Sequence, residues 1–195
     1  MNLDQMVDAI EKLQSAKRFK HSLGVKDVAY DLALIYGYDT MKASIAAILH
    51  DCAKHLSDDE LIGQCNIYNL PVSKYEMQSK FLLHAKVGAL YARKLYGVED
   101  EDILDAITYH TTGRPSMTLL EKIIFTADYI EPNRRPIPRL NTIRKEAYFN
   151  LDQAVYMILE NTLDYLKTTN NVIDEMTIKA YEYYRKLIEA SSINS

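Results

Sequence analysis

Little in this sequence interrupts regular secondary structure. The 195-residue chain contains only six glycines and five prolines, so long tracts run without a strong helix breaker. In most of those tracts the apolar residues recur at helical rather than alternating spacing. The scarcity of breakers and the spacing together predict an all-α protein.

Other absences exclude whole classes of protein. Two cysteines, Cys52 and Cys65, are too few for a disulfide framework and form no paired zinc motif, which favours a reducing setting. No stretch approaches ~18 uninterrupted apolar residues, and the first residues lack the basic and apolar regions of a signal peptide. A net charge of −4 is unlike the basic signature of duplex nucleic-acid binders. We therefore expect a cytoplasmic protein with no nucleic-acid or membrane partner.

Signals for the starts and ends of helices are frequent. Ser57, Ser73 and Thr118 are each followed three residues later by Glu, as in a capping box, while Gly37 and Gly97 follow apolar tracts where a helix often ends. We expect one domain over residues 1–195, because no linker divides the chain. The predicted helices span 3–14, 17–36, 40–55, 58–66, 74–80, 84–96, 100–111, 118–131, 139–148, 151–168 and 175–190.

Several polar residues stand where an apolar residue is expected. Such positions are His21, His50, His84, His110 and Asp128, each inside or at the end of an apolar helical tract. Any one of these histidines alone is more often a hydrogen-bonded core or surface residue, and Asp128 alone could be the buried partner of an arginine. Burying them all without partners would cost about 1–3 kcal/mol each. A shared metal cation would satisfy them together, because neutral imidazoles and carboxylates are its natural ligands.

The segment "AAILHDCAKHL" adds a second feature to this pattern. His50 and Asp51 differ by ~100° around a helix, but both can reach one ion near the helix end. Lys54 projects from nearly the same side as His50, and a lysine there would be repelled by a cation unless an anion lay between them. This arrangement indicates a phosphate ligand. His55 falls on another face, and we expect it at the surface.

The order His21, His50-Asp51 and Asp128, with a lysine three residues after Asp51, resembles the HD superfamily of metal-dependent phosphohydrolases. The segments "KRFKHSLGV", "AAILHDCAKHLSDDEL", "LLHAKVGA", "AITYHTTGR" and "EKIIFTADYIEPNR" narrow the resemblance to the bacterial YqeK family, the symmetrical bis(5′-nucleosyl)-tetraphosphatases. The resemblance is strongest over residues 17–136. It implies a single-domain, HD-type helical bundle that cleaves diadenosine tetraphosphate into two ADP, with iron as the metal.

The resemblance also implies roles for individual residues. It places His21, His50, Asp51 and Asp128 at the positions of the metal ligands. His84 and His110 correspond to histidines near the polyphosphate, where they contact phosphate or complete a second metal site. Further polar positions of the substrate pocket correspond to Arg18, Lys54, Thr111 and Arg134, although Arg18 and Arg134 could also be solvated surface charges. Asn171, in the polar loop 168–177, is a weaker candidate for contact with the base or ribose, because the loop could be only a connection.

The implied reaction is an attack by metal-activated water on an inner phosphorus atom, which expels ADP. Asp51 and Asp128 could orient the water, while His84 and His110 could hold phosphate or protonate the leaving oxygen. One or two iron ions are expected, and manganese, cobalt or nickel would also suit these ligands. Two rivals stay open: another HD phosphohydrolase acting on nucleoside triphosphates or cyclic nucleotides, and a non-catalytic nucleotide-sensing module. A homodimer is possible through the tyrosine-rich last helix.

Overall fold

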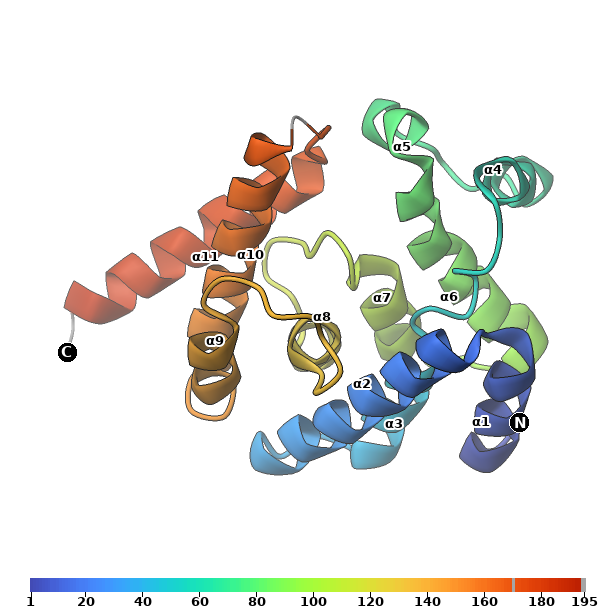
Figure 1. The fold of residues 1–195 in the computed structure, drawn as a ribbon, viewed down its shortest axis with the longest axis horizontal. Coiled ribbons are helices and arrows are strands. Elements are labelled where there is room, and N and C mark those ends of the chain that lie inside the picture. The colour runs from blue at the N-terminus through green and yellow to red at the C-terminus, as the bar shows by residue number, and fades with distance from the viewer. Residues whose placement is uncertain (170, 194–195) are drawn as a thin grey trace.

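The computed structural model describes residues 1–169 and 171–193, with the side chains of 1–169 and 171–191, and every regular element in that part of the chain is helical (Figure 1). The expectation of an all-α fold is thereby confirmed. The elements are α1 (Leu3–Leu13), α2 (Ala16–Ile35), α3 (Thr40–Leu49), α4 (Asp58–Ile67), α5 (Lys74–Gln78), the 3-10 helix η1 (Lys80–Leu82), α6 (Leu83–Tyr96), α7 (Glu101–Tyr109), α8 (Leu119–Ile130), α9 (Leu140–Glu146), α10 (Leu151–Thr168) and α11 (Glu175–Ile193). None of the described helices is both long and apolar enough to span a bilayer.

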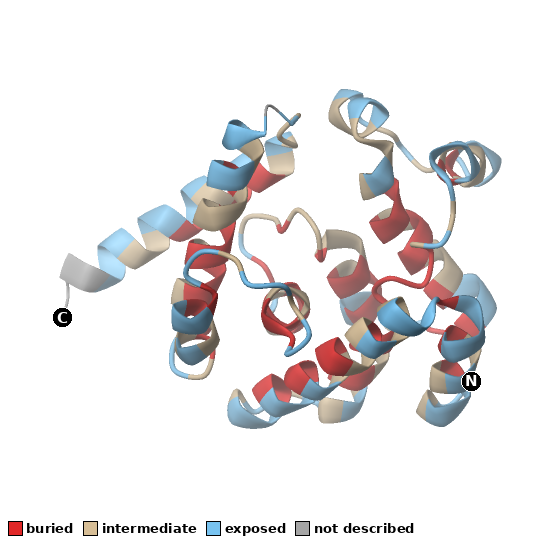
Figure 2. Ribbon diagram, viewed as in Figure 1, coloured by how far each residue is buried: buried red, intermediate tan, exposed pale blue. Residues whose placement is uncertain are grey.

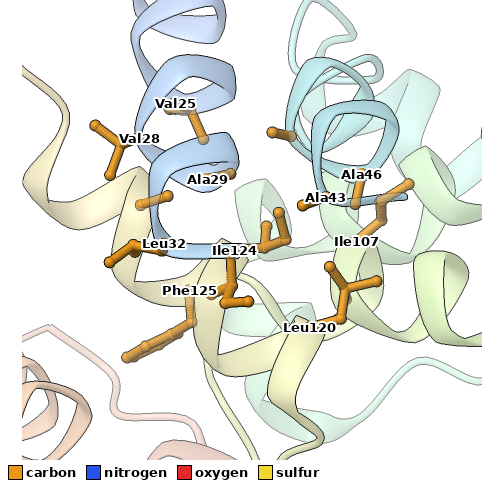
Figure 3. Close-up of a cluster of buried hydrophobic side chains, with 14 of the residues drawn as sticks. Val25, Val28, Ala29, Leu32, Ala43, Ala46, Ile107, Leu120, Ile124 and Phe125 are labelled. Atoms are coloured by element: carbon orange, nitrogen blue, oxygen red, sulfur yellow. The ribbon is translucent and has the colours of Figure 1, made fainter. Parts of the chain in front are cut away.

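Helix α8 lies at the centre of the bundle. It packs against α2, α3 and α7 on one side and against α10 on another, and α11 packs on α10 (Figure 1). Leu32 of α2, Ala46 of α3, Ile107 of α7 and Ile124 of α8 meet in this core (Figure 3). The outer helices α4 and α11 are exposed along much of their length (Figure 2). Burial of apolar surface around α8 therefore holds the bundle together.

A second, smaller apolar cluster attaches α4 to the start of α6. It consists of Ala53, Leu61, Cys65, Leu83 and Val87, all buried. Leu83 directly precedes His84, so this cluster fixes where α6 begins and where that histidine lies. Both cysteines are buried and unpaired, Cys52 in the main core and Cys65 in this cluster.

The predicted helix starts are confirmed at three positions. Complete capping boxes stand at Ser57, Ser73 and Thr118, where the side chain accepts from the backbone three residues on and the glutamate accepts in return. Gly97 ends α6 in the left-handed region with a φ of 73°, a conformation that glycine adopts without strain.

The prediction of one helix over 40–55 is wrong, because α3 ends at Leu49. Tight four-residue turns follow it: the backbone amides of Cys52 and Lys54 donate to the carbonyls of Leu49 and Asp51, each at 3.0 Å. Tertiary partners replace the lost helical bonds, since Gln14 Nε2 donates to the Asp51 carbonyl at 3.3 Å. The turn lets the side chains of His50 and Asp51 face one centre.

Candidate metal centre

Polar side chains from five regions of the bundle converge on one centre. His21 comes from α2, His50 and Asp51 follow α3, His84 is the second residue of α6, His110 follows α7, and Asp128 lies near the end of α8. The Nε2 atoms of His21 and His50 lie 3.4 Å apart, and those of His84 and His110 lie 3.2 Å apart. The structure therefore brings together all six residues that the sequence singled out as ligands or catalytic groups.

Three overlapping sets of these residues have ligand atoms within 4.8 Å of one another. They are His21, His50 and Asp51; His50, His110 and Asp128; and Asp51, His84 and His110. Most of these side chains are buried, with His50 at 0% exposure and His84 at 1%. The cluster is thus an enclosed group of nitrogen and oxygen donors rather than a surface patch of charge.

Asp51 lies between the two histidine pairs. Its Oδ1 is 3.1 Å from His84 Nε2 and 3.5 Å from His110 Nε2, whereas its Oδ2 is 3.5 Å from His50 Nε2 and 3.9 Å from His21 Nε2. Asp128 Oδ1 adds a second carboxylate oxygen, 3.1 Å from His21 Nε2. One carboxylate thus faces both halves of the cluster.

Hydrogen bonds outside the cluster fix the tautomers of three histidines. The Nδ1 atom of His50 contacts the Ala47 carbonyl at 2.6 Å, that of His110 contacts the Ile107 carbonyl at 2.7 Å, and that of His84 contacts the Phe81 carbonyl. A carbonyl oxygen only accepts hydrogen bonds, so we infer that each Nδ1 carries the proton. The Nε2 lone pairs are then directed into the cluster, in the tautomer that metal ligation requires.

A glutamate that the sequence analysis did not single out orients the fourth histidine. Glu131 Oε1 lies 3.3 Å from His21 Nδ1, and Glu131 is only 2% exposed. Its other oxygen accepts from the Asn133 backbone amide at 2.6 Å, which holds the carboxylate in place. Carboxylates behind ligating histidines commonly have this geometry. In the sequence, the one sign of this role was that the glutamate directly precedes Pro132 in "ADYIEPNR". A glutamate in that position more often marks a solvent-exposed helix end.

The donor set fits a metal cation. Two pairs of imidazole nitrogens face each other at 3.2 and 3.4 Å, and a cation bound between them would draw on the lone pairs of both. Imidazole nitrogens with carboxylate oxygens suit first-row transition metals such as iron, manganese, cobalt and nickel. The residues present are therefore adequate to hold such an ion.

The electrostatics of the cluster keep its carboxylates charged. Burial raises the pKa of Asp51, but the surrounding His50, His110 and His84 outweigh it, and the pKa falls well below its usual range. The pKa of Asp128 is lowered in the same way, against burial, by His21, His50 and His110. Both side chains are therefore ionised at neutral pH.

The environment of the cluster shifts the pKa values of His84 and His50 in opposite directions. Burial lowers the pKa of His84 to about 4, with a further contribution from nearby Lys54, so His84 is neutral at pH 7. For His50, burial alone would lower the pKa, but the negative charges of Asp51 and Asp128 raise it. A cation competes for these same positions with protons, as is general for metal sites.

Three cationic side chains surround the cluster. Arg18 Nη1 is 2.8 Å from Asp51 Oδ2, Lys54 Nζ is 3.1 Å from His84 Nε2, and Arg134 Nη1 is 3.9 Å from Asp128 Oδ1. The side chains of Arg18 and Arg134 are 39% and 36% exposed, so both reach solvent at the rim. Burial lowers the pKa of Lys54. Positive charge thus lies beside the cluster, and at Arg18 and Arg134 it reaches the surface.

Two predicted substrate residues lie outside the cluster. Thr111 follows His110 and lines a groove next to it. Asn171 is exposed in the α10–α11 connection, where its side chain donates to Thr169 at 2.9 Å, and none of the hydrogen bonds described for it reaches the histidines or carboxylates. His55 is exposed, as expected.

Known proteins resemble this chain over most of its length. The family model described as "HD domain" matches residues 18–133. The chain is 41% identical to the "Bis(5′-nucleosyl)-tetraphosphatase, symmetrical" of Halalkalibacterium halodurans, over 93% of this chain and 96% of that protein. It is 40% identical to the protein of the same name from Bacillus subtilis, over 94% and 97% of the two chains. It also superimposes with a TM-score of 0.92 on the crystal structure of a predicted HD superfamily hydrolase involved in NAD metabolism from Clostridium acetobutylicum, at 40% identity over 95% of this chain and 98% of that one.

Proposed function

We propose that this chain, which belongs to the HD domain family and within it to the symmetrical bis(5′-nucleosyl)-tetraphosphatases, hydrolyses diadenosine tetraphosphate to two ADP. Water attacks one of the two inner phosphorus atoms, and the bridging oxygen leaves with the other ADP. Because the two halves of the substrate are identical, cleavage of this central link gives two equal products.

One observation supports the proposal most strongly. The Nε2 atoms of four histidines and the ionised Asp51 and Asp128 meet in one cluster. When bound there, a metal cation would polarise a phosphoryl oxygen and lower the pKa of a water molecule. We propose His21, His50, Asp51 and Asp128 as its ligands, with His84 and His110 available for a second ion.

The remaining side chains of the site have separate tasks in this proposal. Lys54, Arg18 and Arg134 neutralise the charge on the phosphoryl oxygens, which is the main requirement of phosphoryl transfer. Asp51 and Asp128, being ionised, can accept a hydrogen bond from the attacking water and orient it. His84 is neutral at pH 7, which favours a role as a ligand or hydrogen-bond acceptor over that of a general acid.

We propose iron as the metal, in one or two ions. The position of Asp51 favours two ions over one, because its two carboxylate oxygens face different histidine pairs. Manganese, cobalt and nickel suit the same ligands and remain alternatives to be separated by elemental analysis.

We also propose that the chain acts in the cytoplasm, where reduced thiols such as Cys52 and Cys65 persist. The working unit is one domain over residues 1–195. A homodimer through α11 stays a prediction; within the monomer, Tyr184 of that helix is 1% exposed and accepts a hydrogen bond from the Met117 amide at 3.1 Å.

The test combines metal content with turnover in anaerobically purified protein. Asp51→Ala should lose most bound metal and lower kcat/KM for diadenosine tetraphosphate by about 10³-fold or more, because it removes the carboxylate shared by both halves of the site. His84→Ala should retain at least one ion and lose rate, and a fall from two ions to one would establish a dinuclear centre. Asp59→Ala is the control, since the Asp59 side chain is 96% exposed.

A panel of nucleotides tests the substrate. Diadenosine tetraphosphate should be turned over fastest, with ADP as the only nucleotide product. Much faster hydrolysis of a nucleoside triphosphate or cyclic dinucleotide would show that the substrate is wrong, and metal-loaded protein that binds nucleotides without turnover would show a sensor instead of an enzyme.

A further inference from the structure

Glu131, the acceptor behind His21, belongs to a turn that follows the central helix α8. The turn closes where the Arg134 backbone amide donates to the Glu131 carbonyl at 3.1 Å. Within it, Glu131 Oε2 accepts from the Asn133 amide at 2.6 Å, while Glu131 Oε1 lies 3.3 Å from His21 Nδ1. The position of this turn therefore decides whether the carboxylate reaches the histidine. Two residues that are distant from the turn in sequence fix its position.

Gly24 leaves the space that the carboxylate occupies. It is buried in α2 three residues after His21, and so lies on the same face of that helix. A Cβ atom at position 24 would lie 2.7 Å from Glu131 Oε2 and 3.3 Å from Pro132 Cδ. Since 2.7 Å is closer than these atoms can approach, a larger residue would displace the carboxylate from His21. Alanine suits the middle of a helix better than glycine, so the advantage of glycine here lies in the close approach of Glu131.

Arg144, which lies on α9, holds the backbone of the same turn. Its Nε donates to the Ile130 carbonyl at 2.9 Å, and its Nη2 donates to the Glu131 carbonyl at 2.7 Å. Carbonyls at the C-terminal end of a helix lack partners within the helix, and a positive charge there is stabilising. The planar guanidinium supplies two donors in fixed directions. It therefore sets the course of the chain where it leaves α8.

We propose that Gly24 and Arg144 are positioning residues of the metal centre. Both act through Glu131: Arg144 fixes its backbone, and Gly24 makes room for the carboxylate that orients His21. The inference rests on the metal site of the proposed function, but not on the proposed substrate.

Gly24→Ala tests the role of the glycine. The probe is Co²⁺, which imidazole and carboxylate ligands accept, and its affinity is measured by competition with a chelator. We expect the affinity to fall about tenfold or more, as for other residues behind metal ligands. Gly63→Ala in α4 is the matched control, because a Cβ atom there would meet nothing within 4 Å, and its affinity should equal that of the wild type. Circular dichroism of the metal-free proteins checks that each variant is folded.

Arg144→Met tests the second residue independently. It removes both donors, so the affinity for Co²⁺ should again fall about tenfold or more. Arg144→Lys keeps the charge and can still donate to a carbonyl, so its affinity should lie between those of Arg144→Met and the wild type. Lys145→Met is the control, since Lys145 is the exposed neighbour on α9, and it should bind Co²⁺ as the wild type does.

Repeating both changes in a Glu131→Ala background shows whether they act through the carboxylate. With no carboxylate left to orient His21, Gly24→Ala and Arg144→Met should each change the affinity by less than about twofold. Equal losses with and without Glu131 would overturn the proposal, and so would wild-type affinity in both Gly24→Ala and Arg144→Met. A wild-type protein that bound no Co²⁺ would overturn it together with the metal site. If the expected losses occurred but the wild type did not hydrolyse diadenosine tetraphosphate, the proposed substrate would fail while the positioning roles stood.

Discussion

At the scale of single residues, the orientation of the histidines is the feature from which the chemistry follows. Each imidazole of the cluster has its Nδ1 engaged by an acceptor outside it: a backbone carbonyl for His50, His84 and His110, and Glu131 for His21. These contacts direct every Nε2 inward before any ligand arrives. Such preorganisation keeps ligands from having to rotate or exchange protons when a metal binds.

Glu131→Gln tests this outer contact. The substitution keeps the size of the side chain but removes the charge that orients His21 and makes its ring more basic. We expect metal affinity to fall about 10–100-fold, as for other residues behind metal ligands. The measurement is competition with a chelator, followed by elemental analysis at each free-metal concentration.

Glu189→Gln is the matched control for this change, because the Glu189 side chain on α11 is 61% exposed and pairs only with Arg185 at 3.8 Å among the contacts described for it. Equal metal affinity in Glu131→Gln and the wild type would mean that the carboxylate merely fills space behind His21.

What the sequence could reveal at this scale depended on how unusual a residue was in its tract. Histidine or aspartate inside an apolar helix is rare enough to be noticed, so the six clustered residues were found. Glu131 follows a helix end, where glutamate is ordinary, and Gln14 lies just after α1. Gln14 supports the site only through the backbone of Asp51, 37 residues away in sequence. Nothing local to either position marks such a long-range contact.

At the scale of helices, starts were more predictable than ends. A helix start is encoded by the side chain that accepts from its free amides, and Ser57, Ser73 and Thr118 all do so. The end of α3 was not predictable from "AAILHDCAKHL", since no glycine or proline stands there. It ends at Leu49 because two partners bind the turn that follows: the side chain of Gln14, just after α1, and the Gly88 carbonyl of α6.

Thr118→Ala tests the contribution of a cap to the bundle. The hydroxyl of Thr118 accepts from the Glu121 amide at the start of the central helix α8. Its loss should lower the free energy of unfolding by about 1 kcal/mol, a typical value for a capping residue. Urea unfolding at fixed metal concentration measures the difference.

The exposed Thr142→Ala on α9 should change the free energy of unfolding by less than about 0.5 kcal/mol, as is usual at surface positions. If Thr118→Ala were no more destabilising than this control, the reciprocal contact between the Thr118 amide and Glu121 Oε2, at 2.6 Å, would suffice to start α8.

At the scale of the whole molecule, the all-α class and the HD-type bundle followed from periodicity and from the resemblance. The groove between α6 and α7, which Thr111 lines, could not be predicted from either of them. Its walls come from the Leu70–Ser73 segment, two helices and the start of α11, which are up to about a hundred residues apart in the chain. Sequence patterns report which face of a helix is apolar, but they do not report the space left where several helices fail to meet.

The pH dependence of stability is also a property of the whole fold. Burial raises the pKa of Tyr96 to about 12, from an ordinary value of 10.0, and Tyr96 is only 7% exposed. The phenol is neutral in the folded protein but ionises in the unfolded chain once the pH exceeds about 10. Its contribution to stability is therefore complete below pH 10 and is lost as the pH rises towards 12. Burial likewise raises the pKa of Cys52 to about 12.

We therefore expect the Tm of the wild type to fall steeply above about pH 9, where the unfolded chain begins to lose protons that the folded state retains. Tyr96→Phe removes one of these groups and keeps the ring, so its Tm should fall less between pH 10 and 11 than that of the wild type, while the two should respond alike between pH 7 and 8. Thermal unfolding across this range measures both slopes. Parallel curves above pH 10 would mean that the Tyr96 hydroxyl reaches solvent in the folded protein and ionises there as readily as in the unfolded chain.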